Sequence, residues 1–147
     1  MPDKLATFLW FDHDAEAAAR LYCAIFPTAQ LTQVTKTSAS FELDGQRYIA
    51  FNGGPHYKLT PAVSIYVACD TQDEVDALWD RFLATGGTAS RCGWLTDCHG
   101  LSWQIIPRQL PALMSDPDPV RAGRVVQAMM AMQKIDIAAL ERAHAGT

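Results

Sequence analysis

The stretch AVSIYVACDTQDEVDALWDRFLATGG, residues 62–87, decides how this chain folds. Residues 62–69 are rich in β-branched and aromatic side chains, which is typical of a strand. Asp70 or Thr71 then stands where a helix cap is needed, and Glu74 is placed for a capping box with Thr71. The chain is therefore expected to change from strand to helix at this point.

The predicted helix has one apolar face and a defined end. Its large apolar side chains recur at spacings of three and four residues: Val75, Leu78, Trp79 and Phe82. Gly86-Gly87 ends the helix. Short strands are predicted next at residues 88–91, 93–96 and 101–106, with a turn at residues 98–100 between the last two. Pro107 ends the unit.

The same order of elements is predicted in the first part of the chain. A strand at residues 6–11 leads to a helix that is capped by Asp12 or Asp14 and ends at Pro27. Strands follow at residues 31–37, 40–43 and 47–51, and the last two flank Asp44-Gly45, a strong hairpin signal. The order strand, helix, strand, strand, strand therefore occurs twice, although the halves share little sequence.

This repetition predicts an α+β protein, a single domain over residues 1–147 with βαβββ modules at about residues 5–55 and 61–107. The modules are expected to form curved mixed sheets around a cleft. The sequence SDPDP at residues 115–119 then signals a helix start, and a helical tail is predicted over about residues 117–143. Because this tail is rich in valine and methionine, we expect it to cover the back of a sheet or a partner subunit.

Composition excludes several classes of protein. Among 147 residues, 49% are hydrophobic and 19% are charged, and the formal net charge is -4, so a nucleic-acid partner or a polybasic membrane surface is not expected. No apolar run approaches the length of a membrane span, and the first residues do not resemble a secretion signal. The four cysteines form no C-x-x-C pair, which favours reduced thiols in a cytoplasmic protein. A Cys92–Cys98 disulfide is the alternative.

Several stretches resemble one protein family. They are LWFD at residues 9–12 with FP at 26–27, FNGGPH at 51–56, CGWL at 92–95 with GLSWQI at 100–105, and KIDIAAL at 134–140. Together they resemble the PhnB-like branch of the vicinal-oxygen-chelate (glyoxalase/bleomycin resistance/dioxygenase) superfamily, whose members are often described as 3-demethylubiquinone-9 3-methyltransferase-like. The resemblance implies paired βαβββ modules and a homodimer, and it leaves the reaction open.

The resemblance also implies where a metal would bind. The superfamily typically holds a divalent metal with His, Gln or Glu side chains on the cleft face of four strands. The corresponding positions here fall near Thr7, Asn52 (or Ala50), Ser64 and Gln104. Since these side chains are neutral and bind metals weakly, we expect no tightly held metal and no cofactor, while weak binding of a divalent metal stays open. The same side chains could bind a small polar ligand, or they could satisfy one another or water.

Alternation along the strands defines the expected ligand-binding residues. On residues 62–69, Ser64 and Tyr66 point away from the face that packs under the helix, and on residues 101–106 Ser102 and Gln104 point away from Trp103. Trp103 is expected to lie in the core. The substrate-binding set is therefore predicted to be Thr7, Asn52, Ser64, Tyr66, Trp94, Ser102 and Gln104.

Histidine offers one catalytic candidate. His56 follows a Gly-Gly-Pro break that we place at the mouth of the cleft, and its imidazole could move a proton. The alternative is a loop histidine that is hydrogen-bonded to the backbone. His13 is expected at a helix entrance, His99 in a hairpin turn, and His144 in a frayed and inert tail.

The sequence therefore leaves three classes of function open. The first is a protein that binds a small polar or aromatic molecule in a metal-poor cleft, and the second is a metal-assisted lyase, isomerase or dioxygenase. The third is a structural or regulatory homodimer, which the apolar tail suggests. Methyl transfer is disfavoured, because a nucleotide-type methyl donor needs a glycine-rich turn between a parallel strand and a helix. The Gly-Gly pairs in this sequence follow a hairpin arm and a helix end instead.

Overall fold

The same strand order occurs twice in the computed structural model, which describes residues 4–147 and divides into two compact units between Thr60 and Pro61. The first unit consists of β1 (Thr7–Phe11), α1 (Ala15–Ile25), β2 (Gln30–Val34), β3 (Ser38–Leu43) and β4 (Gln46–Asn52). Its four-stranded sheet has the order β1-β4-β3-β2, in which β1 and β4 are parallel and the other neighbours are antiparallel.

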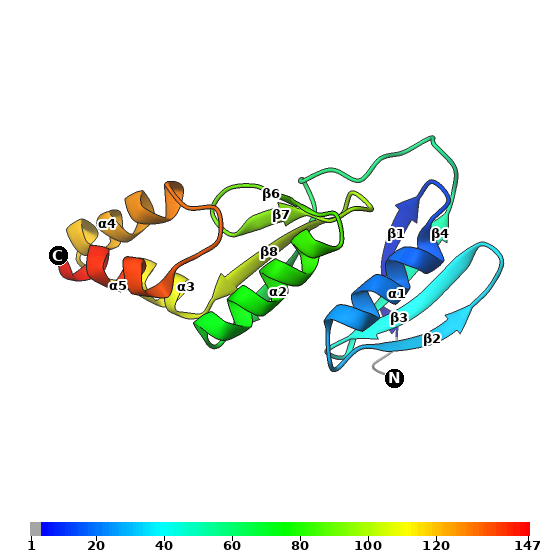
Figure 1. Cartoon of the computed structure of the whole chain (residues 1–147), viewed down its shortest axis with the longest axis horizontal. Helices are drawn as coiled ribbons and strands as arrows, with labels where there is room; N and C mark the ends of the chain where they lie inside the picture. The colour runs from blue at the N-terminus through cyan, green and yellow to red at the C-terminus, as the bar shows by residue number, and fades with distance from the viewer. Residues whose placement is uncertain (1–3) are drawn as a thin grey trace. The chain divides into compact units, whose positions relative to one another are not determined.

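The second unit repeats this arrangement. It consists of β5 (Ser64–Cys69), α2 (Gln72–Ala84), β6 (Thr88–Ala89), β7 (Trp94–Thr96) and β8 (Ser102–Pro107), followed by helices. The sheet order is β5-β8-β7-β6, with β5 and β8 parallel (Figure 1). The predicted α+β class and the two βαβββ modules are therefore confirmed.

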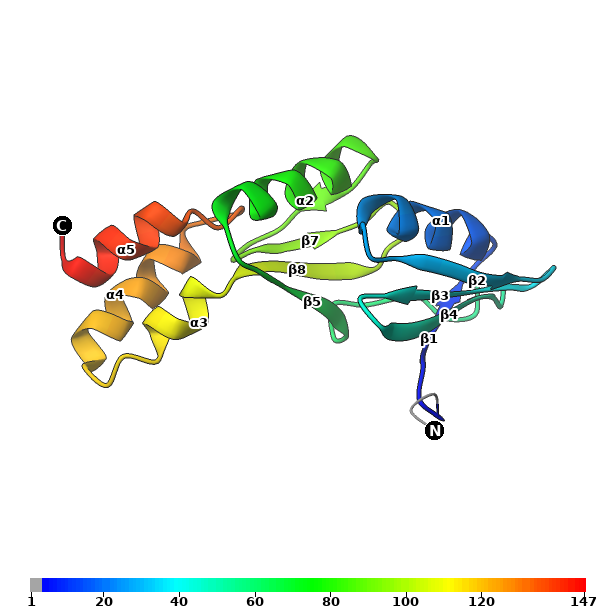
Figure 2. The same cartoon turned by 90° about the horizontal axis from the view of Figure 1, so that it is seen from below.

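In each unit one helix covers one face of the sheet (Figures 1 and 2). The first unit buries the face that includes Leu9, Phe41 and Ala50, and the Tyr22 ring of α1 lies 5.8 Å from the ring of Phe41. In the second unit the α2 residues predicted to form the apolar face are all buried: Val75, Leu78, Trp79 and Phe82. The ring of Phe82 lies 4.8 Å from that of Trp103, which confirms Trp103 as a core residue.

The turn and cap signals hold in part. Asp44-Gly45 forms the predicted hairpin turn with φ values of 50° and 81°, as a turn with two left-handed residues requires. Thr71 caps α2 by accepting from the Glu74 N–H, while the Glu74 carboxylate returns to the N–H of Asp70. β2 ends at Val34 rather than Thr37, because the Thr35 hydroxyl accepts from the Ser38 N–H and closes a tight turn.

One buried carboxylate organises the β7–β8 turn. Asp97 is only 5% exposed, and its two oxygens accept from the backbone N–H groups of His99 and Leu101 and from the Trp103 indole N–H. A charged acceptor with these donors fixes both the turn and the core tryptophan beside it. Nothing in the spacing of the sequence singled out Asp97.

The C-terminal helices are α3 (Gln109–Met114), α4 (Pro119–Met130) and α5 (Ile137–Ala145). The pattern predicted no helix at α3, which contains Pro111 within its first turn, where proline is tolerated. The helices share a buried cluster with the end of β8: Ile106, Leu110, Val125, Ile135 and Leu140. The tail therefore packs against the end of β8, and its expected contact with a partner subunit stays a prediction.

The expectation of a frayed end at His144 was wrong. His144 Nε2 lies 2.7 Å from Asp116 Oδ2 with both side chains half-buried, so α5 is tied to the α3–α4 loop. Arg124 donates to the carbonyls of Ala143 and His144 and caps the end of the same helix. Within residues 4–147, no helix combines the length and apolarity that crossing a bilayer requires.

Replacing Asp97 tests its role in the turn. Asp97→Ala should lower the free energy of unfolding by about 2–4 kcal/mol, because three donors lose a buried charged acceptor. Chemical denaturation measures this change. Asp80→Ala, on the exposed surface of α2, is the matched control and should change the free energy by less than about 0.5 kcal/mol. Equal effects of the two substitutions would contradict the assignment.

The pH dependence of stability tests the Asp116 contact. The Asp118 N–H and then His144 lower the pKa of the Asp116 carboxyl. A pKa lowered by folding stabilises the protein above the unfolded-state pKa, and this stabilisation is lost as the pH falls through the folded-state pKa. Unfolding followed from about pH 6 to about pH 2 should therefore show a smaller loss of stability for Asp116→Asn than for the parent. Parallel curves of stability against pH for the two proteins would contradict this role of Asp116.

Candidate functional site

Five of the predicted ligand-binding residues lie on one face of the second sheet. Trp103 and Leu95 are buried on the side of α2, so strand alternation places their neighbours on the opposite side. We call this side the far face of the second sheet. Its residues are Ser64, Tyr66, Trp94, Thr96, Ser102 and Gln104.

Strand register arranges these residues in two rows. Tyr66 pairs with Gln104 on the neighbouring strand, and Gln104 pairs with Trp94 on the next. The amide side chain therefore lies between two aromatic ones. Ser64, Ser102 and Thr96 form the second row in the same way. Directly paired residues on one face are close enough for a single small molecule to touch them together.

The Tyr66–Gln104–Trp94 row keeps unused hydrogen-bonding groups. Gln104 Nε2 donates to Ser64 Oγ at 2.9 Å, so these two residues satisfy each other in part, which was one alternative for them. Within the described residues, no protein group donates to the Gln104 amide oxygen, and the Trp94 indole N–H and the Tyr66 hydroxyl have no protein partner. The row can therefore both donate to and accept from a ligand.

Exposure differs along this face. The Tyr66 side chain is 52% exposed, whereas Ser102 is almost completely buried. Trp94, Ser64 and Gln104 are half-buried. Tyr66 therefore offers the most accessible surface of this face. Ser102 is too deeply buried to present its hydroxyl to a ligand.

In the first unit, the other two predicted residues lie on the side of the sheet that packs against α1. Thr7 and Asn52 lie on the same face as Leu9, Phe11, Tyr48 and Ala50, which are buried on the side of α1. Asn52 Oδ1 accepts from the Ala15 N–H at 2.8 Å and thereby caps α1, while the Asp14 side chain makes no cap hydrogen bond. Neither residue therefore lies on the side of the first sheet that faces away from α1.

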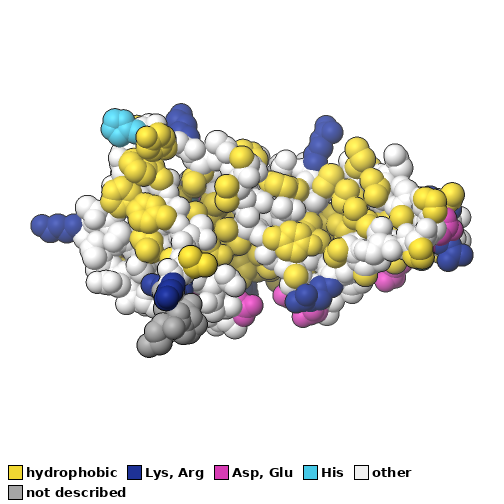
Figure 3. Space-filling view, turned by 180° about the vertical axis from the view of Figure 1, so that it is seen from behind, with side chains coloured by type: hydrophobic (Ala, Val, Ile, Leu, Met, Phe, Trp, Pro, Cys, Tyr) yellow, Lys and Arg dark blue, Asp and Glu magenta, His cyan; other side chains and the backbone are white. Residues whose placement is uncertain are grey.

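The far face of the first sheet carries an aromatic cluster instead. Phe51 lies 5.3 Å from both Phe8 and Trp10, and Tyr57 lies 5.0 Å from Trp10. Phe8 is 56% exposed and Tyr57 is 68% exposed. Figure 3 shows hydrophobic side chains gathered on the side of this unit that faces away from α1.

Backbone contacts fix the central indole of this cluster. The Trp10 indole N–H donates to the Gly54 carbonyl at 2.9 Å. A Cβ at Gly53 would lie 2.1 Å from the indole ring, so only glycine leaves room for the ring at this position. His56 follows on an exposed turn of the same unit. Its catalytic role stays a prediction.

The residues present do not fit a tightly bound divalent metal. The far faces of β1, β4, β5 and β8 carry aromatic, aliphatic, hydroxyl and amide side chains and one arginine: Phe8, Trp10, Arg47, Ile49, Phe51, Ser64, Tyr66, Ala68, Ser102, Gln104 and Ile106. Imidazole, thiolate and carboxylate ligands are absent from this set. Nor do residues 4–147 contain a group of three His, Cys, Asp or Glu side chains that could hold a metal ion.

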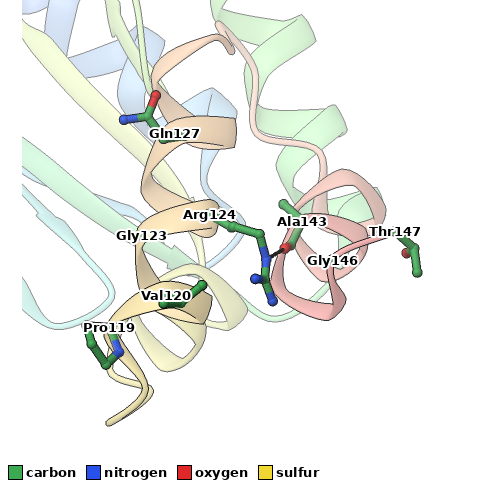
Figure 4. A pocket seen from close by; sticks show the side chains of 8 residues that line it. All are labelled: Pro119, Val120, Gly123, Arg124, Gln127, Ala143, Gly146 and Thr147. Carbon is green, nitrogen blue, oxygen red and sulfur yellow. Dashed lines mark hydrogen bonds between the residues drawn. The ribbon is translucent and has the colours of Figure 1, made fainter.

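The cysteines and the tail complete the candidate groups. All four cysteines are free thiols, and burial raises the pKa of Cys69 to about 12, so this thiol stays protonated and unreactive at neutral pH. A groove of about 630 Å³ lies between α4 and α5, next to Arg124 and Gly123 (Figure 4). The sequence did not predict this groove, because it forms only where the two helices meet.

Comparisons with known proteins identify relatives. The profile of the 3-demethylubiquinone-9 3-methyltransferase family matches residues 3–106. A PhnB protein from Bacillus cereus is 28% identical with a TM-score of 0.65, covering 71% of this chain and 99% of its own. A glyoxalase-related enzyme from Fulvimarina pelagi is 17% identical with a TM-score of 0.55, covering 73% of this chain and 90% of its own. Among curated proteins no match is found.

Gly53→Ala tests whether the Trp10 position depends on the missing side chain. The added Cβ would overlap the indole ring, so the free energy of unfolding should fall by about 1–3 kcal/mol and the tryptophan emission should change. Chemical denaturation and fluorescence measure both effects. Gly123→Ala is the control, because its Cβ would meet nothing within 4 Å, and it should stabilise the helix by up to about 1 kcal/mol. An unchanged Gly53→Ala protein would contradict the contact.

Proposed function

The chain belongs to the 3-demethylubiquinone-9 3-methyltransferase family, and on that premise we propose that it binds a planar, hydroxylated aromatic or quinone molecule on the far face of the second sheet. The observation that carries this proposal is the Tyr66–Gln104–Trp94 row. Two aromatic side chains provide contact area for a flat ring, and the amide between them provides polarity.

The polar groups of the row favour a ligand with hydroxyl or carbonyl oxygens. The Gln104 amide oxygen can accept from a ligand hydroxyl, while the Trp94 indole N–H can donate to a ligand carbonyl. A ligand without such groups would leave these atoms unpaired after it displaced water from them, which costs binding free energy. Polarity is therefore expected to select among flat ligands.

Tyr66 serves this proposal as a hydrogen-bond donor. Burial raises the pKa of its phenol, although the positive charge of Arg108 acts in the opposite direction. The phenol is therefore protonated at neutral pH and cannot act there as a base. For this reason we propose binding of a ligand rather than proton abstraction on this face.

The family name suggests a class of ligand, but it also names a methyl-transfer activity that the turns of this chain do not fit. It refers to 3-demethylubiquinone, a quinone, which fits a flat ligand with ring oxygens. A methyl donor of the nucleotide type requires a glycine-rich turn that leads from a parallel strand into a helix. Here Gly53-Gly54 follow the end of β4 and are followed by an irregular segment, whereas Gly86-Gly87 connect α2 to β6. Since neither turn fits such a donor, we derive no methyl-transfer step.

Binding of 2-naphthol and of naphthalene tests the proposal. Both are flat, but only 2-naphthol carries a hydroxyl group, so it should bind about fivefold more tightly, the equivalent of one hydrogen bond. Tyr66→Ala and Trp94→Ala should each weaken the binding of 2-naphthol about tenfold, because each removes an aromatic contact. Gln104→Leu should remove the preference for the hydroxyl. Calorimetric titration measures all these affinities.

Tyr57→Ala is the matched control, since it removes an exposed tyrosine, 68% exposed against 52% for Tyr66, from the first unit. It should leave the affinity for 2-naphthol unchanged. Loss of binding in Tyr57→Ala, with full binding in Tyr66→Ala and Trp94→Ala, would show that the ligand binds the first unit. The proposed site on the second sheet would then be wrong. No binding of either probe by the parent protein would refute the proposed function.

A further inference from the structure

The backbone just before Trp94 is strained. Cys92 has φ of 58° and Gly93 has φ of 83°, so two successive residues adopt left-handed conformations. Glycine adopts this conformation freely, whereas a cysteine there is strained because its Cβ lies too close to the following carbonyl oxygen. Such strain persists only where the surrounding structure enforces it, and it often occurs at functional sites. Trp94 is the next residue and belongs to the Tyr66–Gln104–Trp94 row.

The C-terminal segment holds this strained turn in place. The Cys92 N–H donates to the Met132 carbonyl at 2.9 Å, and the Gly93 N–H donates to the Gln133 carbonyl at 2.8 Å. A Cβ at Gly93 would lie 2.6 Å from Ile106 Cδ1 and 3.0 Å from Ile135 Cγ1. The turn is therefore enclosed between β8 and the segment that joins α4 to α5. We call residues 132–137 the joining segment.

The joining segment is itself attached to α2. Gln72 Nε2 donates to the Ile135 carbonyl at 2.9 Å, and Gln72 Oε1 accepts from the Ile137 N–H at 2.8 Å. Lys134 Nζ lies 2.9 Å from Asp76 Oδ1. The Gln72 side chain is thus hydrogen-bonded to the backbone on both sides of Asp136. All these tail residues lie beyond residue 106, where the family match ends.

We propose that the joining segment positions Trp94 and thereby sets the ligand affinity of the far face of the second sheet. Gln72 acts in this scheme as a positioning residue, because it holds the joining segment against α2. The strained turn transmits the position of that segment to Trp94, since left-handed residues are stable here only with their N–H groups bound to Met132 and Gln133. The affinity part rests on the proposed function.

Fluorine NMR of the full-length protein labelled with 5-fluorotryptophan tests the proposal. The chain has four tryptophans, and Trp94→Phe assigns the Trp94 signal by its disappearance. Gln72→Ala should shift or broaden the Trp94 signal and leave the Trp10 signal unchanged. Its affinity for 2-naphthol should fall about three- to tenfold, because a smaller fraction of the protein then holds Trp94 in the binding position.

Substitutions at Cys92 provide an independent test that leaves the Gln72 contacts intact. Cys92→Val places a β-branched residue in the left-handed conformation, which it tolerates poorly, so the Trp94 signal should move as it does in Gln72→Ala. Cys92→Gly tolerates the same conformation and is the conservative variant that should restore the parent signal and affinity. Gln127→Ala, on the side of α4 that lines the groove in Figure 4, is the control and should change neither.

The outcomes separate this proposal from the proposed function. If the parent binds 2-naphthol, but Gln72→Ala and Cys92→Val change neither the Trp94 signal nor the affinity, the positioning role is overturned. If the Trp94 signal responds to both variants while the parent does not bind 2-naphthol, positioning is supported and the ligand assignment fails. If Gln72→Ala does not fold, Cys92→Val and Cys92→Gly give the result on their own.

Discussion

One helix can bury only one face of a four-stranded sheet, and this limit governs both units of the chain. The buried faces hold the apolar side chains that stabilise each unit. The opposite faces must then present whatever side chains alternate with them, since successive residues of a strand point in opposite directions. The aromatic cluster of the first unit and the Tyr66–Gln104–Trp94 row of the second are both consequences of this geometry.

The two units use the same topology for different chemistry. Phe8, Trp10 and Phe51 give the far face of the first sheet a cluster of aromatic side chains. In the second sheet, pairing of β5 with β8 and of β8 with β7 places an amide between two aromatic residues. This mixture of flat apolar surface and unused polar groups is characteristic of small-molecule sites.

The C-terminal helices connect stability with the candidate site. They share a core with Ile106 at the end of β8, and they bind the backbone that leads into β7. Asp97 fixes the other end of β7 through the turn to β8. The strand that carries Trp94 is therefore held at both ends by contacts outside the Tyr66–Gln104–Trp94 row.

Periodicity and turn signals in the sequence were sufficient for the order of elements, the buried face of α2, the hairpin at Asp44-Gly45 and the shared face of Ser64, Tyr66 and Gln104. These features depend on residues close together in the chain, whose side-chain directions follow from local geometry. The face of Thr7 and Asn52, the helix α3, the His144–Asp116 contact and the role of Asp97 were decided by the tertiary structure. Each depends on a contact between distant residues or on a register that one residue can reverse, and local patterns do not encode such contacts.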